Sequence, residues 1–182
     1  MQRANGRLNI SFYNNEIKNM YYNTPLRAFA NDDGNEDINS VALVNTSGGV
    51  VSGDKHSVKI NINNSKAMIF SQSAEKIYKS VNDIEATINN EVVVGENSWL
   101  EWLPQETILF EKSKLIRNLK IHLNKNSESL IGEIIILGRL AKGEFSKDIF
   151  LKDSIFIYKD TKLQWLDIVL LNNELDKTKK SI

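Results

Sequence analysis

Hydrophobic and polar residues alternate along the chain in short runs, and turns rich in Asn, Gly, Asp and Ser separate these runs. Short alternating or continuous apolar runs bounded by such turns are typical of β-strands. No segment keeps a helical period over three turns, and the best candidate, 72–80, is short enough to be one helical turn or a bent strand. The pattern predicts a mainly β fold with at most short helices. The expected strands lie at 8–13, 41–44, 57–62, 67–71, 84–88, 115–123, 149–151 and 154–158.

A loose repeat is visible in three segments, 62–72, 94–105 and 124–135. Each has a polar turn, then a serine, then an apolar strand, and the spacing is about 30 residues. This spacing fits the coils of a β-solenoid, whose strands stack into continuous sheets. An antiparallel sandwich gives similar spacing and stays open as an alternative. We expect stacked sheets of β-helix-like character in a single domain over 1–171, followed by a polar, frayed tail over 172–182.

Three acidic residues interrupt apolar strands: Glu101 in SWLEWLPQETILF, Glu133 in LIGEIIIL and Asp167 in LQWLDIVLL. Alternation places each acid on a face with bulky apolar neighbours, so all three are predicted to point toward an interior. A buried ionised carboxylate costs several kcal/mol unless it is paired or hydrogen-bonded. Each acid therefore has a functional interpretation and a structural one, in which backbone donors or a basic side chain satisfy it.

The composition limits the chemistry of any site. The chain has no cysteine, which excludes disulfide frameworks and thiolate catalysis, and His56 and His122 are its two histidines. A bound metal would therefore meet mostly oxygen ligands. Such a site would be weak or transient for nickel or zinc, which prefer nitrogen and sulfur donors.

The charge balance limits the partners. Lysine plus arginine and aspartate plus glutamate each total 23, so the formal net charge is zero. No strong field would draw the chain to nucleic acid or to an anionic membrane. There is no apolar run of about 18 residues, and the opening MQRANGRLNISF lacks the apolar core of a signal peptide. We expect a cytoplasmic protein without nucleic-acid or membrane partners.

Two further patterns have chemical alternatives. The glycine-rich segment NTSGGVVSGD, which ends at Asp54, matches no phosphate-binding motif, so a glycine-permitted bend is the favoured interpretation. Glu101 with Glu106, or Glu101 with Glu133, could form the paired carboxylates of a carbohydrate-active enzyme on a solenoid scaffold.

Four motifs together resemble the UreD family of urease accessory proteins, also called UreH. These motifs are VALVNTSGGVVSGD, IFSQSAEKIYKS, WLEWLPQETILF and EIIILGRLAKGE, in the family's order and spacing. Two mild departures are Ser71, where members often have Thr, and Lys79, where Arg is usual. The chain is thus identified as a member of this family along nearly all its length.

The resemblance implies a scaffold without catalytic turnover of its own. Members bind UreF, which recruits the nickel-carrying GTPase UreG, and the assembly docks on apo-urease so that nickel reaches the urease active site. The resemblance also implies a mainly β fold of stacked sheets, an internal tunnel as the nickel route, and no tightly bound cofactor beyond nickel in transit.

Carried over to this sequence, the resemblance suggests a transient nickel path lined by Asp54, Glu133 and Asp167. In the alternative, these acids hold the fold together through partners such as Arg139 or Lys76. The further residues expected to line the tunnel or to support it are Glu75, Glu101, Gly48, Gly49, Gly53, Trp102, Pro104 and Arg139.

Family members continue well beyond the position of Leu171. We therefore expect a C-terminally shortened member, in which missing strands would leave an open sheet edge.

Overall fold

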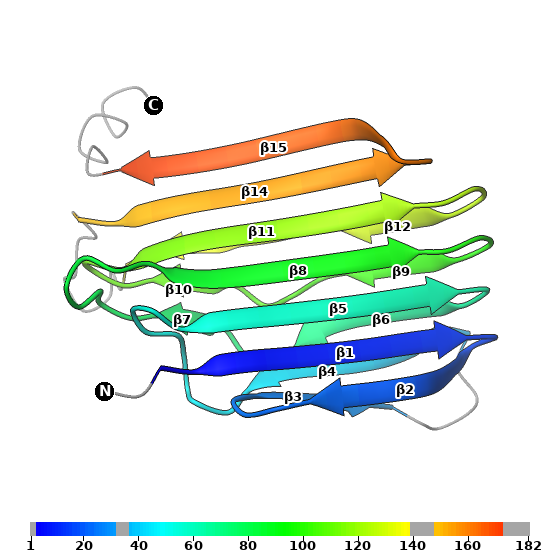
Figure 1. The fold of residues 1–182 in the computed structure, drawn as a ribbon, viewed down its shortest axis with the longest axis horizontal. Coiled ribbons are helices and arrows are strands. Elements are labelled where there is room, and N and C mark those ends of the chain that lie inside the picture. Colours follow the sequence, from blue (N-terminus) through cyan, green and yellow to red (C-terminus); the bar gives the residue numbers. More distant parts are fainter. Residues whose placement is uncertain (1–2, 32–36, 139–147, 173–182) are drawn as a thin grey trace.

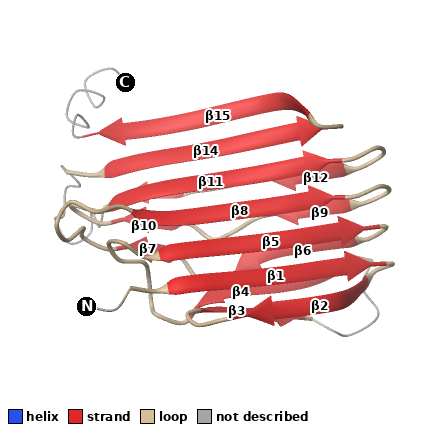
Figure 2. Ribbon diagram, in the orientation of Figure 1, coloured by secondary structure: helices blue, strands red, loops and turns tan. Residues whose placement is uncertain are grey.

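The computed structural model describes residues 3–31, 37–138 and 148–172, and every regular element in these residues is a β-strand (Figure 2). The prediction of a mainly β fold is confirmed. The segment 72–80 contains the short strand β7 (Glu75–Ile77) and no helical turn.

The strands form three sheets (Figure 1). The long sheet has the order β15 (Lys162–Asn172), β14 (Phe150–Lys159), β11 (Lys114–Leu123), β8 (Ala86–Val94), β5 (Lys55–Asn63), β1 (Asn5–Tyr13) and β2 (Glu16–Tyr22). The second sheet has the order β12 (Glu128–Ile131), β9 (Trp99–Trp102), β6 (Lys66–Ser71), β4 (Asn39–Asn45) and β3 (Leu26–Ala30). The third has the order β13 (Ile135–Leu137), β10 (Thr107–Leu109) and β7.

Successive coils visit the three sheets in turn, which makes the fold a β-solenoid. One coil runs β5, β6, β7, the next β8, β9, β10, and the next β11, β12, β13. Equivalent strands stack in parallel, so that Ile60 lies between Ile10 and Val92 in the long sheet. The repeat seen in the sequence is one coil, and the sandwich alternative is wrong.

Each coil turns from the long sheet into the second sheet at an Asn-Ser pair. The asparagines adopt left-handed backbone conformations, with φ of 46° at Asn64, 51° at Asn97 and 54° at Asn126. Asparagine tolerates this region better than most residues. The serines that follow are Ser65, Ser98 and Ser127, all of them buried. Trp99 N donates to the carbonyl of Ser65, and Glu128 N donates to that of Ser98, so the turns are bonded from coil to coil.

Inward-facing side chains of the coils form the core. Buried and exposed residues alternate along the strands of the long sheet. In β5, His56, Val58 and Ile60 point inward and the residues between them point outward. One large hydrophobic cluster includes Phe12, Ile69 and Leu100, and a second includes Ile77, Leu109 and Leu115. Burial of these apolar side chains supplies the main stabilisation of the fold.

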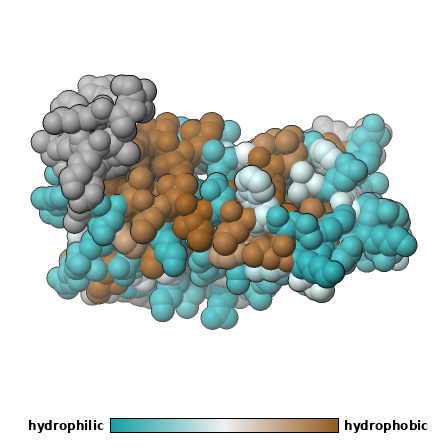
Figure 3. Space-filling view, turned by 90° about the horizontal axis from the view of Figure 1, so that it is seen from above, coloured by the Kyte–Doolittle hydropathy of each residue, from teal (hydrophilic) through white to brown (hydrophobic). Residues whose placement is uncertain are grey.

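The long sheet extends beyond the two sheets that face it. β14 pairs in parallel with β11, and β15 folds back antiparallel to β14, but the facing sheets end at β12 and β13. Nearly every residue of β15 is exposed, including Trp165 and Leu170 at 61% each. Seen from above in Figure 3, hydrophobic side chains gather over this edge of the molecule. The prediction that Asp167 points toward an interior is therefore wrong, because the described residues include no sheet that covers β15.

Candidate functional site: a polar cavity inside the solenoid

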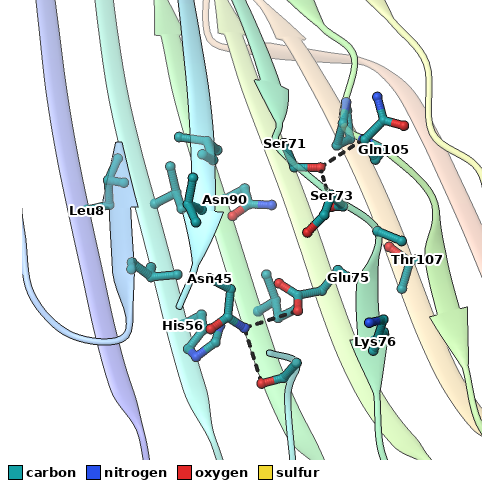
Figure 4. A pocket seen from close by; sticks show the side chains of 18 of the residues that line it. Leu8, Asn45, His56, Ser71, Ser73, Glu75, Lys76, Asn90, Gln105 and Thr107 are labelled. Atoms are coloured by element: carbon teal, nitrogen blue, oxygen red, sulfur yellow. Dashed lines mark hydrogen bonds between the residues drawn. The ribbon is translucent and has the colours of Figure 1, made fainter. Parts of the chain in front are cut away.

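A cavity of about 150 Å³ lies inside the coils. This volume has room for about five water molecules. Strands β5, β8 and β11 of the long sheet provide one wall, with His56, Asn90 and Arg117 among its residues. The opposite wall comes from the segments where successive coils pass from the second sheet to the third. Its polar residues include Asn45, Ser71, Ser73, Glu75, Lys76, Gln105 and Thr107, which Figure 4 labels. Glu133 and Arg27 also line the cavity.

Glu75 is tied to the glycine-rich loop. Asn45 Nδ2 donates to Glu75 Oε1 over 3.0 Å and to the carbonyl of Gly49 over 3.2 Å, as Figure 4 shows for the first contact. Asn45 Oδ1 in turn accepts from the N–H and the hydroxyl of Ser47. Burial raises the pKa of the Glu75 carboxyl to about 7, against the lowering effect of the Asn45 hydrogen bond. Glu75 therefore changes charge near neutral pH.

Arg117 lies at the centre of a buried cluster of charges. Its Nε and Nη2 donate to the two carboxylate oxygens of Asp153 over 2.9 and 2.6 Å, and its Nη1 donates to Thr107 Oγ1 over 2.9 Å. The side chains of Arg117, Asp153 and Glu133 are only 6 to 8% exposed. The two-point contact with Asp153 is the strong, geometrically specific form of this ion pair.

Glu133 is the second carboxylate of the cluster, and it is held differently. Trp102 Nε1 donates to Glu133 Oε1 over 3.0 Å. Glu133 Oε2 lies 2.7 Å from Arg117 Nη2, yet no donor among the described residues is aligned to make a hydrogen bond to it. We interpret this short distance as a charge contact without hydrogen-bond geometry. Burial raises the pKa of Glu133, the positive charge of Arg117 opposes this, and the negative charge of Asp153 adds to it. The prediction that Glu133 points inward is confirmed.

Within the described residues, two more polar atoms in the cavity wall have no hydrogen-bond partner. His56 Nε2 and Asn90 Oδ1 are buried without a hydrogen bond, although their residues are only 3% and 8% exposed. Burial lowers the pKa of His56, and the nearby charge of Asp54 raises it by a smaller amount. Buried polar atoms without protein partners usually bind water or a ligand. The cavity thus has a mixed lining, with apolar side chains such as Leu8 and Val58 between polar groups that could bind a hydrated ion or a small polar molecule.

Asp54 lies beside this cavity and is not part of its lining. The side chain is 3% exposed, and its two oxygens accept hydrogen bonds from the N–H groups of Ala4 and Val51 over 2.8 and 3.0 Å. These bonds join the N-terminal segment to the glycine-rich bend. The contacts of Asp54 thus agree with the structural interpretation, in which backbone donors satisfy the buried acid.

Glu101 is on the outer side of the second sheet. In β9, Leu100 and Trp102 are 0% and 2% exposed, whereas Trp99 and Glu101 are half-buried on the opposite face, where Trp99 Nε1 donates to Glu101 Oε1. The prediction that Glu101 points inward is wrong, because both faces of this strand are apolar and alternation alone cannot choose between them. Glu101 and Glu133 do not share a site, so this pair cannot act as the two carboxylates of a glycosidase.

The other predicted residues divide into two groups. Gly48, Gly49, Trp102 and Pro104 line the cavity. At Gly49, with φ of 148°, an added Cβ would lie 2.5 Å from the ring of Tyr78 and 2.6 Å from the carbonyl of Lys76, so the predicted close approach at this bend is confirmed. Gly53 faces Arg3 outside the cavity lining. Arg139 lies outside the described residues, as does the expected tail apart from Asn172, which ends β15.

Sequence reasoning missed the central cation of the site. Arg117 lies on the inward face of β11, between the buried residues Leu115 and Leu119. Asp153 is likewise buried on β14, two residues after the buried Leu151. The period-two pattern that singled out Glu133 would have found both residues. Within the described residues, no group of three or more His, Asp or Glu side chains is placed to hold a metal ion, and no helix could cross a membrane. Asp54, Glu133 and Asp167 are therefore not brought together.

The family comparison agrees with the motifs. Residues 3–181 match the family model of the UreD urease accessory protein. A protein from Magnetococcus marinus named urease accessory protein UreD is 31% identical over 180 residues, which cover 96% of this chain and 62% of that protein. A UreD from a Chelativorans species is 41% identical over 66% of this chain and 44% of its own length, and UreD 2 from Methylorubrum populi is 37% identical over 81% and 50%. The chain thus spans about half to three fifths of these curated relatives, and it belongs to the UreD urease accessory protein family.

Proposed function

We propose that this protein is a non-catalytic accessory component of urease maturation, through whose interior cavity nickel passes on its way to the urease active site. The family supports the maturation role, since the relatives are named urease accessory proteins. The cavity supports the passage, and the observation that carries it is the pair of carboxylates, Glu75 and Glu133, that face one polar space inside the solenoid.

The chemistry of these groups suits transfer better than storage. Carboxylate and amide oxygens hold nickel less tightly than thiolates or several imidazoles would, so an ion that enters can leave again. On the long-sheet wall, which lies opposite these carboxylates, Asn90 Oδ1 and His56 Nε2 add two buried atoms without a hydrogen-bond partner among the described residues. A hydrated cation would satisfy these atoms and would relieve the cost of burying the carboxylates.

The proposed path is narrower than the one expected from the sequence. Asp167 is left out because β15 is exposed, and Asp54 because backbone N–H groups occupy its two oxygens. We propose UreF, UreG through UreF, and the urease subunits as partners, in the cytoplasm. These partners follow from the family resemblance.

Co-expression tests the maturation role. The 182-residue chain is co-expressed with UreF, UreG and the urease subunits, the complex is recovered on a tag carried by this chain, and nickel per urease active site is measured. We expect a complex and nickel-loaded urease, compared with nickel-poor urease when the chain is omitted. Equal nickel content with and without this chain would contradict the proposed role.

A further inference from the structure

The charges of the buried cluster formed by Arg117, Asp153 and Glu133 do not balance when both carboxylates are ionised. Arg117 carries one positive charge, whereas Asp153 and Glu133 carry two negative charges when both are ionised, so the cluster has a surplus of one negative charge. All three side chains are more than nine tenths buried. A surplus charge in such surroundings is costly, and a further cation would offset it.

The hydrogen bonds distinguish the two carboxylates. Asp153 accepts two aligned bonds from Arg117, and it does not line the cavity. Glu133 lines the cavity, and its Oε2 makes only a charge contact with Nη2, without a hydrogen bond. Aligned two-point contacts are the stronger ones. Arg117 is therefore firmly bound to Asp153 and loosely bound to Glu133.

We propose that Arg117 is a resident counter-ion of Glu133, which a divalent metal cation entering the cavity displaces while Asp153 and Thr107 keep hold of the guanidinium. The inference rests on the proposed function, because nickel is the cation in question. The bond from Trp102 Nε1 to Oε1 keeps the Glu133 carboxylate in position when the arginine contact is lost. A carboxylate with its own counter-ion binds metal weakly, which favours release of the metal over retention.

Removal of the arginine together with its firm partner tests this directly. The double variant Arg117→Gln/Asp153→Asn leaves Glu133 as the one charge of the cluster, so the net charge of the cluster does not change. Calorimetric titration of the purified chain with Ni²⁺ alone should show affinity at least about tenfold higher than in the wild type, because the competing positive charge is gone. Addition of Glu133→Gln to this variant should abolish the gain.

The matched control is the exposed pair Lys59 and Glu91, whose charged atoms lie 3.6 Å apart on the outer face of the long sheet. Lys59→Gln/Glu91→Gln removes one positive and one negative charge without touching the cavity and should leave the Ni²⁺ affinity unchanged. Unchanged or weaker Ni²⁺ binding by a folded Arg117→Gln/Asp153→Asn variant would overturn the proposal. Circular dichroism establishes whether the variant is folded.

A second measurement needs no substitution. Titration of the wild-type chain with Zn²⁺, which is diamagnetic, is followed by nuclear magnetic resonance of the Arg117 side-chain N–H groups and the Glu133 carboxyl carbon. The proposal predicts that both signals move together, and a Glu133 signal that moves without the Arg117 signal would contradict it. This titration and the co-expression test of the maturation role have separate outcomes. If nickel loading of urease did not depend on this chain, the proposed function would be refuted, but the displacement of Arg117 by a metal cation would still be supported by the titration.

Discussion

At the scale of single residues, the buried carboxylates in and beside the cavity differ in the groups that compensate the cost of their burial. Asp153 is compensated by two aligned bonds from Arg117, and Glu133 by one indole N–H and a charge contact. Among the described side chains, Glu75 accepts a hydrogen bond from the amide of Asn45, and its pKa rises to about 7. The three acids thus differ in how readily each would accept an additional cation.

Glu75 should make stability depend on pH. Its pKa is about 7 in the folded chain, raised from an ordinary value of 4.5, so the folded state holds the proton more tightly than the unfolded state does. The contribution of Glu75 to the free energy of unfolding is therefore fully present below pH 4.5 and is lost as pH rises to about 7. The loss is at most roughly 3 kcal/mol, because the residue is only partly buried.

The variant Glu75→Gln cannot titrate, and it serves as the reference. Urea unfolding followed by circular dichroism at several pH values should show this variant gaining stability relative to the wild type between pH 4.5 and about 7, with a constant difference above that range. A difference that does not vary with pH would show that Glu75 is not buried as described.

The sequence predicted some of these residues and missed others for identifiable reasons. Alternation predicted the inward direction of Glu133 correctly, although the residue lies in the segment 132–134 between β12 and β13 and not within a strand. It failed for Glu101, since both faces of β9 carry large apolar side chains, and for Asp167, since alternation gives the faces of a strand but not what covers them. The same alternation places Arg117 on the inward face of β11, although a basic residue was not among the predicted interior groups.

At the scale of elements, the Asn-Ser turns set the register of the coils. The left-handed asparagine reverses the chain, and the serine that follows is buried against the next coil, where Ser65 N lies 3.4 Å from Ser98 Oγ. This local signal recurs in every coil, which is why the repeat could be recognised from the sequence. The arrangement of the strands in three sheets could not be predicted from the sequence, because strand order depends on contacts between coils.

The left-handed turn at Asn97 gives a direct test. Asn97→Val should lower the free energy of unfolding by about 1 to 2 kcal/mol, because a β-branched residue is strained at φ of 51°. Asn97→Gly should be close to neutral, since glycine adopts this conformation freely. Urea unfolding of both variants provides the measurement. Equal losses in the two variants would mean that the asparagine side chain, and not the backbone conformation, stabilises the turn.

At the scale of the whole molecule, stacking of coils brings together residues that are far apart in the sequence. Glu75 and Glu133 come from the same corner of two coils, whereas His56 and Arg117 come from the long sheet opposite. The result is a cavity with polar groups on both walls inside a hydrophobic solenoid, lined in part by the glycine-rich loop. Our central claim is that nickel passes through this space.

The most direct test of this claim is the nickel content of urease matured with cavity variants of this chain. The double variant Glu75→Gln/Glu133→Gln keeps the size and hydrogen-bonding capacity of the side chains while removing both cavity charges. Its control, Glu101→Gln/Asp167→Asn, removes two acids outside the cavity. We predict that both variants assemble with the urease machinery and that nickel per urease active site falls severalfold only with the cavity variant. Full nickel loading with an assembled cavity variant would contradict passage through the cavity.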